Sequence, residues 1–248
     1  MMKSLVPFEI APQPDEITCG PTCLHAIYRF YQDPISLEQT IAEVSMLEEG
    51  GTLAVLLACH ALERGYRATI YTYKLQLFDP TWASLSPTAL AEKLKAQARY
   101  KPDEKLRIAT SAYLQFLELG GELRAKDLNG RLLRAFLNQG TPIITGLSAT
   151  YLYRSPREYG PKCDYDDIRG EPSGHFVVLH GYDQQQRLVH VADPLQSNPL
   201  TGSRKYEASM DRVINAILLG VLTYDANLLI IQPARGKQNA QTHPDRRR

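Results

Sequence analysis

Cysteine is scarce in this chain of 248 residues, which has four of them, at positions 19, 23, 59 and 163. So few cysteines at irregular spacing cannot build a disulfide framework, and no Cys-x-x-Cys pair is present to bind zinc or to undergo redox chemistry. Net charge is also nearly absent, because 28 lysines and arginines are balanced by 27 aspartates and glutamates. This balance argues against a surface that binds nucleic acid or an anionic membrane.

Long apolar runs are missing as well. The N-terminal residues contain no apolar stretch of signal-peptide length, and the run at 216–222 is short and interrupted by Gly220. We therefore expect a cytoplasmic protein with free thiols and no membrane span. The sequence has no internal repeat. One composition shift near its end predicts a domain at 1–233 and a disordered basic tail at 234–248.

The spacing of apolar residues changes from helical to alternating along the chain. A helical period predicts helices over residues 18–31, 50–62, 87–98 and 126–138, with Thr18 and Asp127 as N-caps. Alternating or β-branched stretches predict strands over 67–73, 142–147, 175–182, 188–193, 218–223 and 227–231. Helices first and strands afterwards indicate an α+β domain, with N-terminal helices packed on a C-terminal antiparallel sheet.

Cys19 stands at the start of the first predicted helix, next to Gly20. The helix macrodipole and the unpaired N–H groups of a first turn favour a thiolate, which is the form that attacks carbonyl carbons. Gly20 is expected to let a substrate backbone approach the thiol. On its own the pattern also fits a small core residue in an amphipathic helix, so further groups are needed to assign chemistry.

Two later residues could complete a nucleophilic site around Cys19. His175 opens a predicted strand, and an imidazole is the usual base and acid beside a nucleophilic thiol. Asp193 ends the next strand, where its carboxylate could orient the imidazole. With residues 183–186 as the hairpin turn, His175 faces residue 194, so Asp193 falls next to the position opposite His175.

An amide cleaved by a thiolate also needs hydrogen-bond donors for the negative oxygen that develops. The backbone N–H of Cys19 can supply one donor. The side-chain amide of Gln13, upstream of the helix, can supply another. A single glutamine carries little information. The assignment of Gln13 depends on its position before the cysteine, the histidine and the aspartate in the sequence.

Four short stretches carry these residues, namely 13–23 (QPDEITCGPTC), 50–52 (GGT), 174–179 (GHFVVL) and 191–194 (VADP). Together they resemble the papain-like peptidase domain of bacteriocin exporters, which removes leaders that end in two glycines. The resemblance covers residues 9–74 and 140–196. It implies a papain-like cysteine peptidase fold without a cofactor or metal. It also implies roles for four residues: nucleophile for Cys19, general base and acid for His175, orienting group for Asp193 and oxyanion donor for Gln13.

The chain departs from that family in three places. It has no transporter segments, so we expect a stand-alone version, with a peptide or protein substrate and no nucleic-acid partner. Residues 75–139 are longer than a minimal domain of this type needs. Residues 148–173 hold four tyrosines and an acidic run, and form either a lid or binding wall over the site or a structural excursion packed by its tyrosines. Specificity and oligomeric state stay open.

Three other functions stay open at this stage. His175, His180, His190 and Cys163 could bind zinc, although His175 and His180 would face opposite sides of a strand and no zinc-binding spacing is present. The same thioester chemistry could serve acyl transfer or deamidation. The domain could also be a catalytically inactive peptide-binding module, against which the intact set of four site residues argues.

Overall fold

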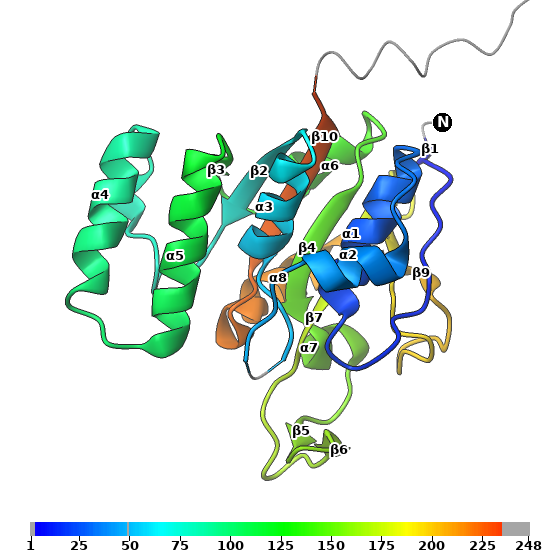
Figure 1. The fold of residues 1–248 in the computed structure, drawn as a ribbon. Helices are drawn as coiled ribbons and strands as arrows, with labels where there is room; N and C mark the ends of the chain where they lie inside the picture. The colour runs from blue at the N-terminus through cyan, green and yellow to red at the C-terminus, as the bar shows by residue number, and fades with distance from the viewer. Residues whose placement is uncertain (1–2, 49, 235–248) are drawn as a thin grey trace, which may run out of the picture.

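A twisted sheet runs through the middle of the computed structural model, which describes residues 3–48 and 50–234 (Figure 1). Its strands lie in the order β3 (Glu122–Arg124), β2 (Tyr66–Thr72), β10 (Asn227–Pro233), β4 (Ile143–Ser148), β7 (Gly174–Asp183), β8 (Leu188–Ala192) and β9 (Lys205–Ser209), with β1 (Lys3–Leu5) paired to the end of β7. The strand pairs are antiparallel except for β2 with β3. Apart from position 234, the predicted tail lies outside the described residues.

Helices cover both faces of the sheet and enclose two apolar cores. Successive side chains of a strand point to opposite faces, so Phe176 and Val178 lie in one core while Val177 and Leu179 lie in the other. The first core is covered by α1 (Cys19–Phe30), α3 (Ala54–Glu63), α4 (Pro87–Ala98) and α5 (Glu104–Glu118), with α2 (Leu37–Glu43) against α1. The second is covered by α6 (Gly130–Leu137), α7 (Ala149–Tyr153) and α8 (Met210–Leu219).

The predicted α+β fold is confirmed, and several elements fall close to their expected bounds. The helices expected at 18–31, 50–62 and 87–98 are α1, α3 and α4. The strands expected at 67–73, 142–147 and 227–231 are β2, β4 and β10. The helix expected from 126 begins later, as α6, because the side chain of Asn129, and not Asp127, accepts from the first N–H groups.

One predicted strand is wrong. Residues 218–223 form the end of α8 and a short 3₁₀ turn, η2 (Gly220–Thr223), and β10 pairs instead with β2 and β4. The apolar residues here repeat at helical spacing, since Val213, Ala216 and Ile217 are buried, and Ser209 caps the helix by accepting from the N–H of Arg212. Helices α2 and α5 were not predicted from the sequence.

The hairpin between β7 and β8 has a different register from the predicted one. Asp183 pairs with Leu188, so the turn lies at 184–187, where Arg187 has a positive φ of 56°. A bulge between Leu179 and Gly181 then shifts the pairing by one residue. As a result Val178 lies opposite Ala192, and position 193 is the first residue beyond the paired stretch.

Residues 148–173 contain α7 and a small hairpin of β5 (Glu158–Tyr159) and β6 (Asp164–Tyr165), which projects from the body at the lower edge of Figure 1. This segment joins β4 to β7, so both of its ends lie beside the start of β7. Within the described residues, no helix is both long enough and apolar enough to span a membrane.

Candidate active site

Cys19 is the first residue of α1, and its side chain is nearly enclosed, with the residue 9% exposed. Thr18 occupies the N-cap position as predicted, but its side chain makes no capping hydrogen bond. The first N–H groups of a helix have no partner within the helix, so those at the start of α1 are not satisfied by their cap. A thiol here lies in the positive end of the helix dipole, next to N–H groups that can donate to an anion.

Gly20 has a packing role that differs from the predicted one. It is buried, and a Cβ on it would lie 2.5 Å from the methyl group of Thr52 and 3.3 Å from the ring of Phe176. The missing side chain therefore makes room for the Gly-Gly-Thr segment at 50–52 rather than for a substrate. This contact fixes the first turn of α1 against the segment that leads into α3.

His175 links Cys19 to Asp193. It is the second residue of β7 and is buried, and its Nε2 lies 2.9 Å from Oδ1 of Asp193. The ring also interacts electrostatically with the thiol of Cys19, and this interaction helps to raise its pKa. Since Nε2 is engaged by the carboxylate, Nδ1 is the nitrogen left to face the thiol. Burial alone would lower the pKa of His175, but the charges of Asp193 and Cys19 raise it well above its ordinary value, so the imidazolium is stabilised.

Asp193 is fully buried and accepts four hydrogen bonds. Oδ1 accepts from His175 and from the N–H of Leu195 at 2.9 Å, and Oδ2 accepts from the hydroxyls of Tyr153 at 2.7 Å and Tyr206 at 2.8 Å. Burial pushes its pKa upward, but His175 and these donors outweigh burial, so the pKa of the carboxyl is lowered. The carboxylate is thus held charged and in one orientation.

The two tyrosines were not identified from the sequence. Tyr153 ends α7, inside the tyrosine-rich segment that was expected to be either a lid or binding wall or a structural excursion, and Tyr206 lies on β9. The only feature of the sequence that pointed to either of them was the concentration of tyrosines at 148–173, which does not indicate which tyrosine side chain is buried.

Gln13 lies beside the end of the Asp193 strand. Its backbone N–H donates to the carbonyl of Pro194 at 2.9 Å, which ties the segment before α1 to the residue after Asp193. Its side-chain Nε2 donates to the carbonyl of Asp15 at 2.7 Å, and its Oε1 is buried without a hydrogen-bond partner among the described residues. A side-chain amide carries two N–H groups, so one donor remains for a ligand.

The sequence matches the model of the Peptidase_C39-like family over residues 6–215, which is most of the chain. The chain belongs to this family. It is a cysteine peptidase, as the motifs around Cys19 and His175 led us to expect. A comparison with curated proteins gave no match.

The solved structures that match this chain are distant in sequence. A C39-like peptidase from Bacillus anthracis is 14% identical, with 94% of this chain and 99% of that chain covered and a TM-score of 0.46. The peptidase domain of Streptococcus ComA, a bifunctional ABC transporter, is 14% identical, with 92% and 100% covered and a TM-score of 0.44. Xylellain, a cysteine protease from Xylella fastidiosa, is 13% identical, with 94% and 85% covered and a TM-score of 0.44.

The other cysteines of the peptidase differ from Cys19 in their surroundings. Cys23 is buried and donates to the carbonyl of Phe176 at 3.3 Å, and burial raises its pKa well above the usual value. Burial also raises the pKa of Cys59 to about 12. Cys163 is exposed in the projecting hairpin, where desolvation and the nearby carboxylate of Glu158 raise its pKa. All four thiols are free.

The histidines that a zinc site would need are engaged separately. Nδ1 of His180 lies 3.2 Å from the carbonyl of Val6, and Nδ1 of His190 lies 3.2 Å from the carboxylate of Glu207. Across residues 3–48 and 50–234, no three side chains of histidine, cysteine, aspartate or glutamate converge as a metal site would require.

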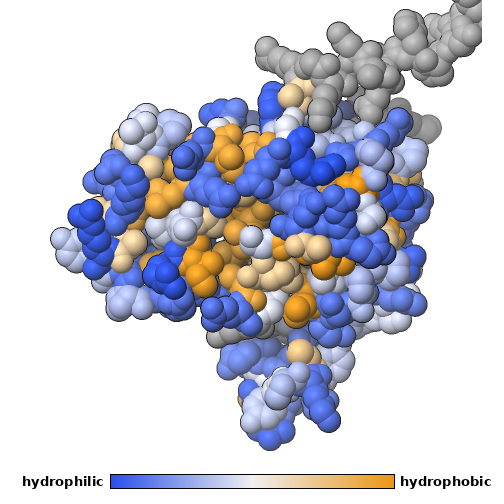
Figure 2. All heavy atoms as spheres, viewed as in Figure 1, coloured by the Kyte–Doolittle hydropathy of each residue, from blue (hydrophilic) through white to orange (hydrophobic). Residues whose placement is uncertain are grey.

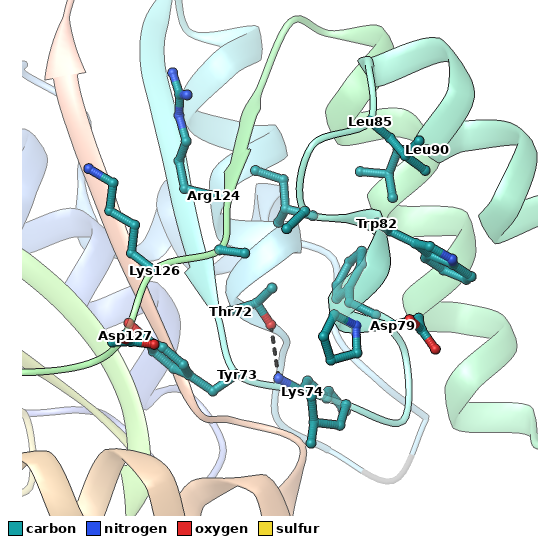
Figure 3. Close-up of a pocket in the computed structure, with 16 residues that line it drawn as sticks. Thr72, Tyr73, Lys74, Asp79, Trp82, Leu85, Leu90, Arg124, Lys126 and Asp127 are labelled. Atoms are coloured by element: carbon teal, nitrogen blue, oxygen red, sulfur yellow. Dashed lines mark hydrogen bonds between the residues drawn. The ribbon is translucent and has the colours of Figure 1, made fainter.

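The peptidase also has a cavity of about 420 Å³ between the end of β2, the chain that leads from β2 into α4, and β3 with the residues after it (Figure 3). Its apolar lining includes Phe78, Trp82, Leu90 and Leu123, and it contains no residue of the Cys19 site. Apolar side chains reach the surface between the helices of this face (Figure 2). The lengthened segment therefore adds α4 and α5 to the layer that α1 and α3 form, and its cavity is separate from the Cys19 site.

Proposed function

We propose that this peptidase cleaves a peptide or isopeptide bond with Cys19 as nucleophile, His175 as general base and acid, and Asp193 as the group that orients His175. The observation that carries the proposal is the hydrogen bond between His175 and the buried Asp193 carboxylate, together with the electrostatic interaction of His175 with the Cys19 thiol. Cys19 stands at the start of a twelve-residue helix, where the dipole favours an anion.

In the resting site, the thiol proton moves to His175, which leaves a thiolate beside an imidazolium. The raised pKa of His175 favours this transfer, because the imidazole holds the proton more tightly than it would in water. Asp193 supports the imidazolium without accepting the proton, since its own pKa is lowered.

The thiolate then attacks the carbonyl carbon of the substrate, and the C=O π electrons move to the oxygen. When the tetrahedral intermediate collapses, the C–N bond breaks and the proton on His175 passes to the leaving amine, which gives a thioester on Cys19. A water molecule next gives a proton to His175 and adds to the thioester carbon. Collapse of this second intermediate releases the carboxylic acid and restores the thiol.

The negative oxygen of each intermediate would be stabilised by the backbone N–H of Cys19 and by the side-chain amide of Gln13. Two features support this role. The N–H groups that begin α1 are not used by a side-chain cap, and Gln13 is anchored next to Pro194 with one amide N–H to spare. Donors that are already in place need no reorganisation when the charge develops.

Tyr153 and Tyr206 would act as positioning residues. Their hydroxyls occupy Oδ2 of Asp193, so only Oδ1 is turned toward His175. Because Oδ1 accepts from Nε2 of His175, the ring is held with Nδ1 toward the thiol, in the tautomer that carries its proton on Nε2. The expected substrate is a peptide or protein, and the cytoplasmic location remains a prediction from the sequence.

A screen of peptide and isopeptide amides tests the proposal. The wild-type protein should hydrolyse at least one amide, Cys19→Ala should hydrolyse none, and Cys23→Ala should retain the activity because the Cys23 thiol is buried against Phe176. An amine added to the reaction distinguishes hydrolysis from acyl transfer, since an acyltransferase would give the amine adduct as its main product. Full activity in Cys19→Ala would end the proposal.

A further inference from the structure

An open groove of about 520 Å³ lies next to the start of β7, on the side of the sheet covered by α7 and α8. Its wall includes Ser148, which pairs with Gly174 next to His175, and Thr150, whose hydroxyl accepts from the N–H of Ser173 at 3.0 Å. The groove therefore begins where the 148–173 segment meets the strand that carries His175. None of the four proposed catalytic residues lines it.

The charge of the groove is of one sign, although the chain as a whole is nearly neutral. Arg154, Arg157 and Arg212 line it, and no aspartate or glutamate does. Within the described residues, none of these three guanidinium groups forms a salt bridge. Arg157 and Arg212 donate to backbone carbonyls, which fixes their place; the charge of Arg157 is felt by the nearby carboxylate of Asp166, with which it forms no salt bridge.

The same groove has an apolar side. Leu219 at the end of α8 and Leu222 in η2 line it and are 38% and 65% exposed, and Tyr151 of α7 is 39% exposed beside Arg212. Guanidinium groups bind carboxylates with two parallel hydrogen bonds, and exposed leucines next to them favour an apolar neighbour. A chain with acidic and apolar side chains satisfies both parts of the groove.

We propose that this arginine groove binds an acidic and apolar stretch of the peptide substrate, and so selects which chains present an amide to Cys19. This inference rests on the proposed function, because it assigns a specificity to that site. It also gives the 148–173 segment a role as a binding wall, since Tyr151, Arg154 and Arg157 all come from it.

Binding to Cys19→Ala protein tests the inference without catalysis. The probe is a fluorescein-labelled peptide that alternates glutamate with leucine, and its matched copy carries glutamine in place of each glutamate. By fluorescence anisotropy the glutamate peptide should bind more tightly, and the difference should shrink at high ionic strength. Adding Arg154→Gln should weaken its binding roughly two- to fivefold, as expected for one exposed ion pair, and Arg154→Glu should weaken it further.

Arg154 is exposed at the end of α7, so its substitution should leave the thermal unfolding midpoint unchanged. Arg154→Lys keeps the charge and should retain the preference, and Lys126→Gln, which removes an exposed cation outside the groove, should have no effect. Equal binding of the two peptides, or a preference that Arg154→Glu leaves intact, would overturn the inference. An equally charged oligonucleotide that binds more tightly than the peptide through the same arginine would also overturn it. If the preference holds but wild-type protein cleaves no amide, the proposed function fails and the groove remains a peptide site.

Discussion

The first two turns of α1 carry the same residue type in opposite surroundings. In the first turn, Cys19 faces His175 and lies among N–H groups that its cap leaves free. One turn later, Cys23 is fully buried, its thiol donates to a carbonyl, and its pKa is raised. The proposed function therefore assigns the reactivity of Cys19 to what the fold brings to its thiol, namely the imidazole of His175 and the helix end, and not to the cysteine or the helix alone.

Replacing the imidazole should remove this difference and have the largest effect. In His175→Ala, turnover is expected to fall to the background level and the rate of alkylation of Cys19 to fall toward that of Cys23, because no base holds the thiol proton. Steady-state kinetics and mass spectrometry measure the two effects. His180→Ala, on the same strand and remote from the thiol, is the control, and retained turnover in His175→Ala would contradict the account.

The oxyanion donor gives the next largest effect. Gln13→Ala should lower kcat by about a hundred- to a thousandfold, corresponding to a loss of roughly 2.7–4 kcal/mol of transition-state stabilisation, if its amide donates to the oxyanion. Alkylation of Cys19 should change little, because the thiol and imidazole are untouched. Gln184→Ala in the hairpin turn serves as the control. The loss of one oxyanion donor should lower kcat far more than about threefold. A kcat within about threefold of wild type would therefore remove Gln13 from the site.

Neutralising Asp193 should change the pH dependence more than the rate at neutral pH. The carboxylate raises the pKa of His175, so the imidazolium persists at neutral pH and is lost as the pH rises through the raised pKa. In Asp193→Asn that pKa should fall, and the alkaline limb of the pH–rate profile should move to lower pH by about one to three units. Asp79→Asn, at an exposed site, should leave the limb in place, and an unmoved limb in Asp193→Asn would contradict the pairing.

The tyrosines should give the smallest effect, on the acid side of the profile. The hydrogen bond from Tyr153 helps to lower the pKa of Asp193, and Tyr206 donates to the same oxygen, so Tyr153→Phe or Tyr206→Phe should let the carboxylate take up a proton at a higher pH during acidification. The acid limb should therefore move to higher pH, while the free energy of unfolding falls by about 1.5–3 kcal/mol for each lost bond to a charged group. Tyr182→Phe is the matched buried control. A loss of stability without a shift of the acid limb would reduce both tyrosines to a structural role.

The sequence predicted which residues come together better than the register that brings them together. Cys19, His175 and Asp193 were found from residue type and order, because a helix start, a strand start and a strand end are local signals. The register that joins the last two was wrong from the turn onward, since Asp183 pairs with Leu188, and the bulge between Leu179 and Gly181 then moves the pairing one residue back toward the predicted one.

Other features depend on contacts between distant segments and could not be predicted. Tyr206 meets Asp193 only because β9 pairs with β8, and Gly20 is required only because Thr52 packs on it. The apolar residues at 218–223 fitted a strand as well as a helix end, and the cap at Ser209 lay outside the stretch that was considered. Local patterns therefore indicated the candidate site residues, and tertiary packing determined what surrounds them.

Competitive alkylation of the folded wild-type protein tests the central claim most directly. Iodoacetamide is applied at about pH 6, where an ordinary thiol is almost wholly protonated, and the modified cysteines are mapped by mass spectrometry over time. The account predicts that Cys19 is modified first, ahead of the exposed Cys163, while Cys23 and Cys59 stay unmodified. Modification of Cys163 before Cys19, or no modification of Cys19 at all, would contradict it.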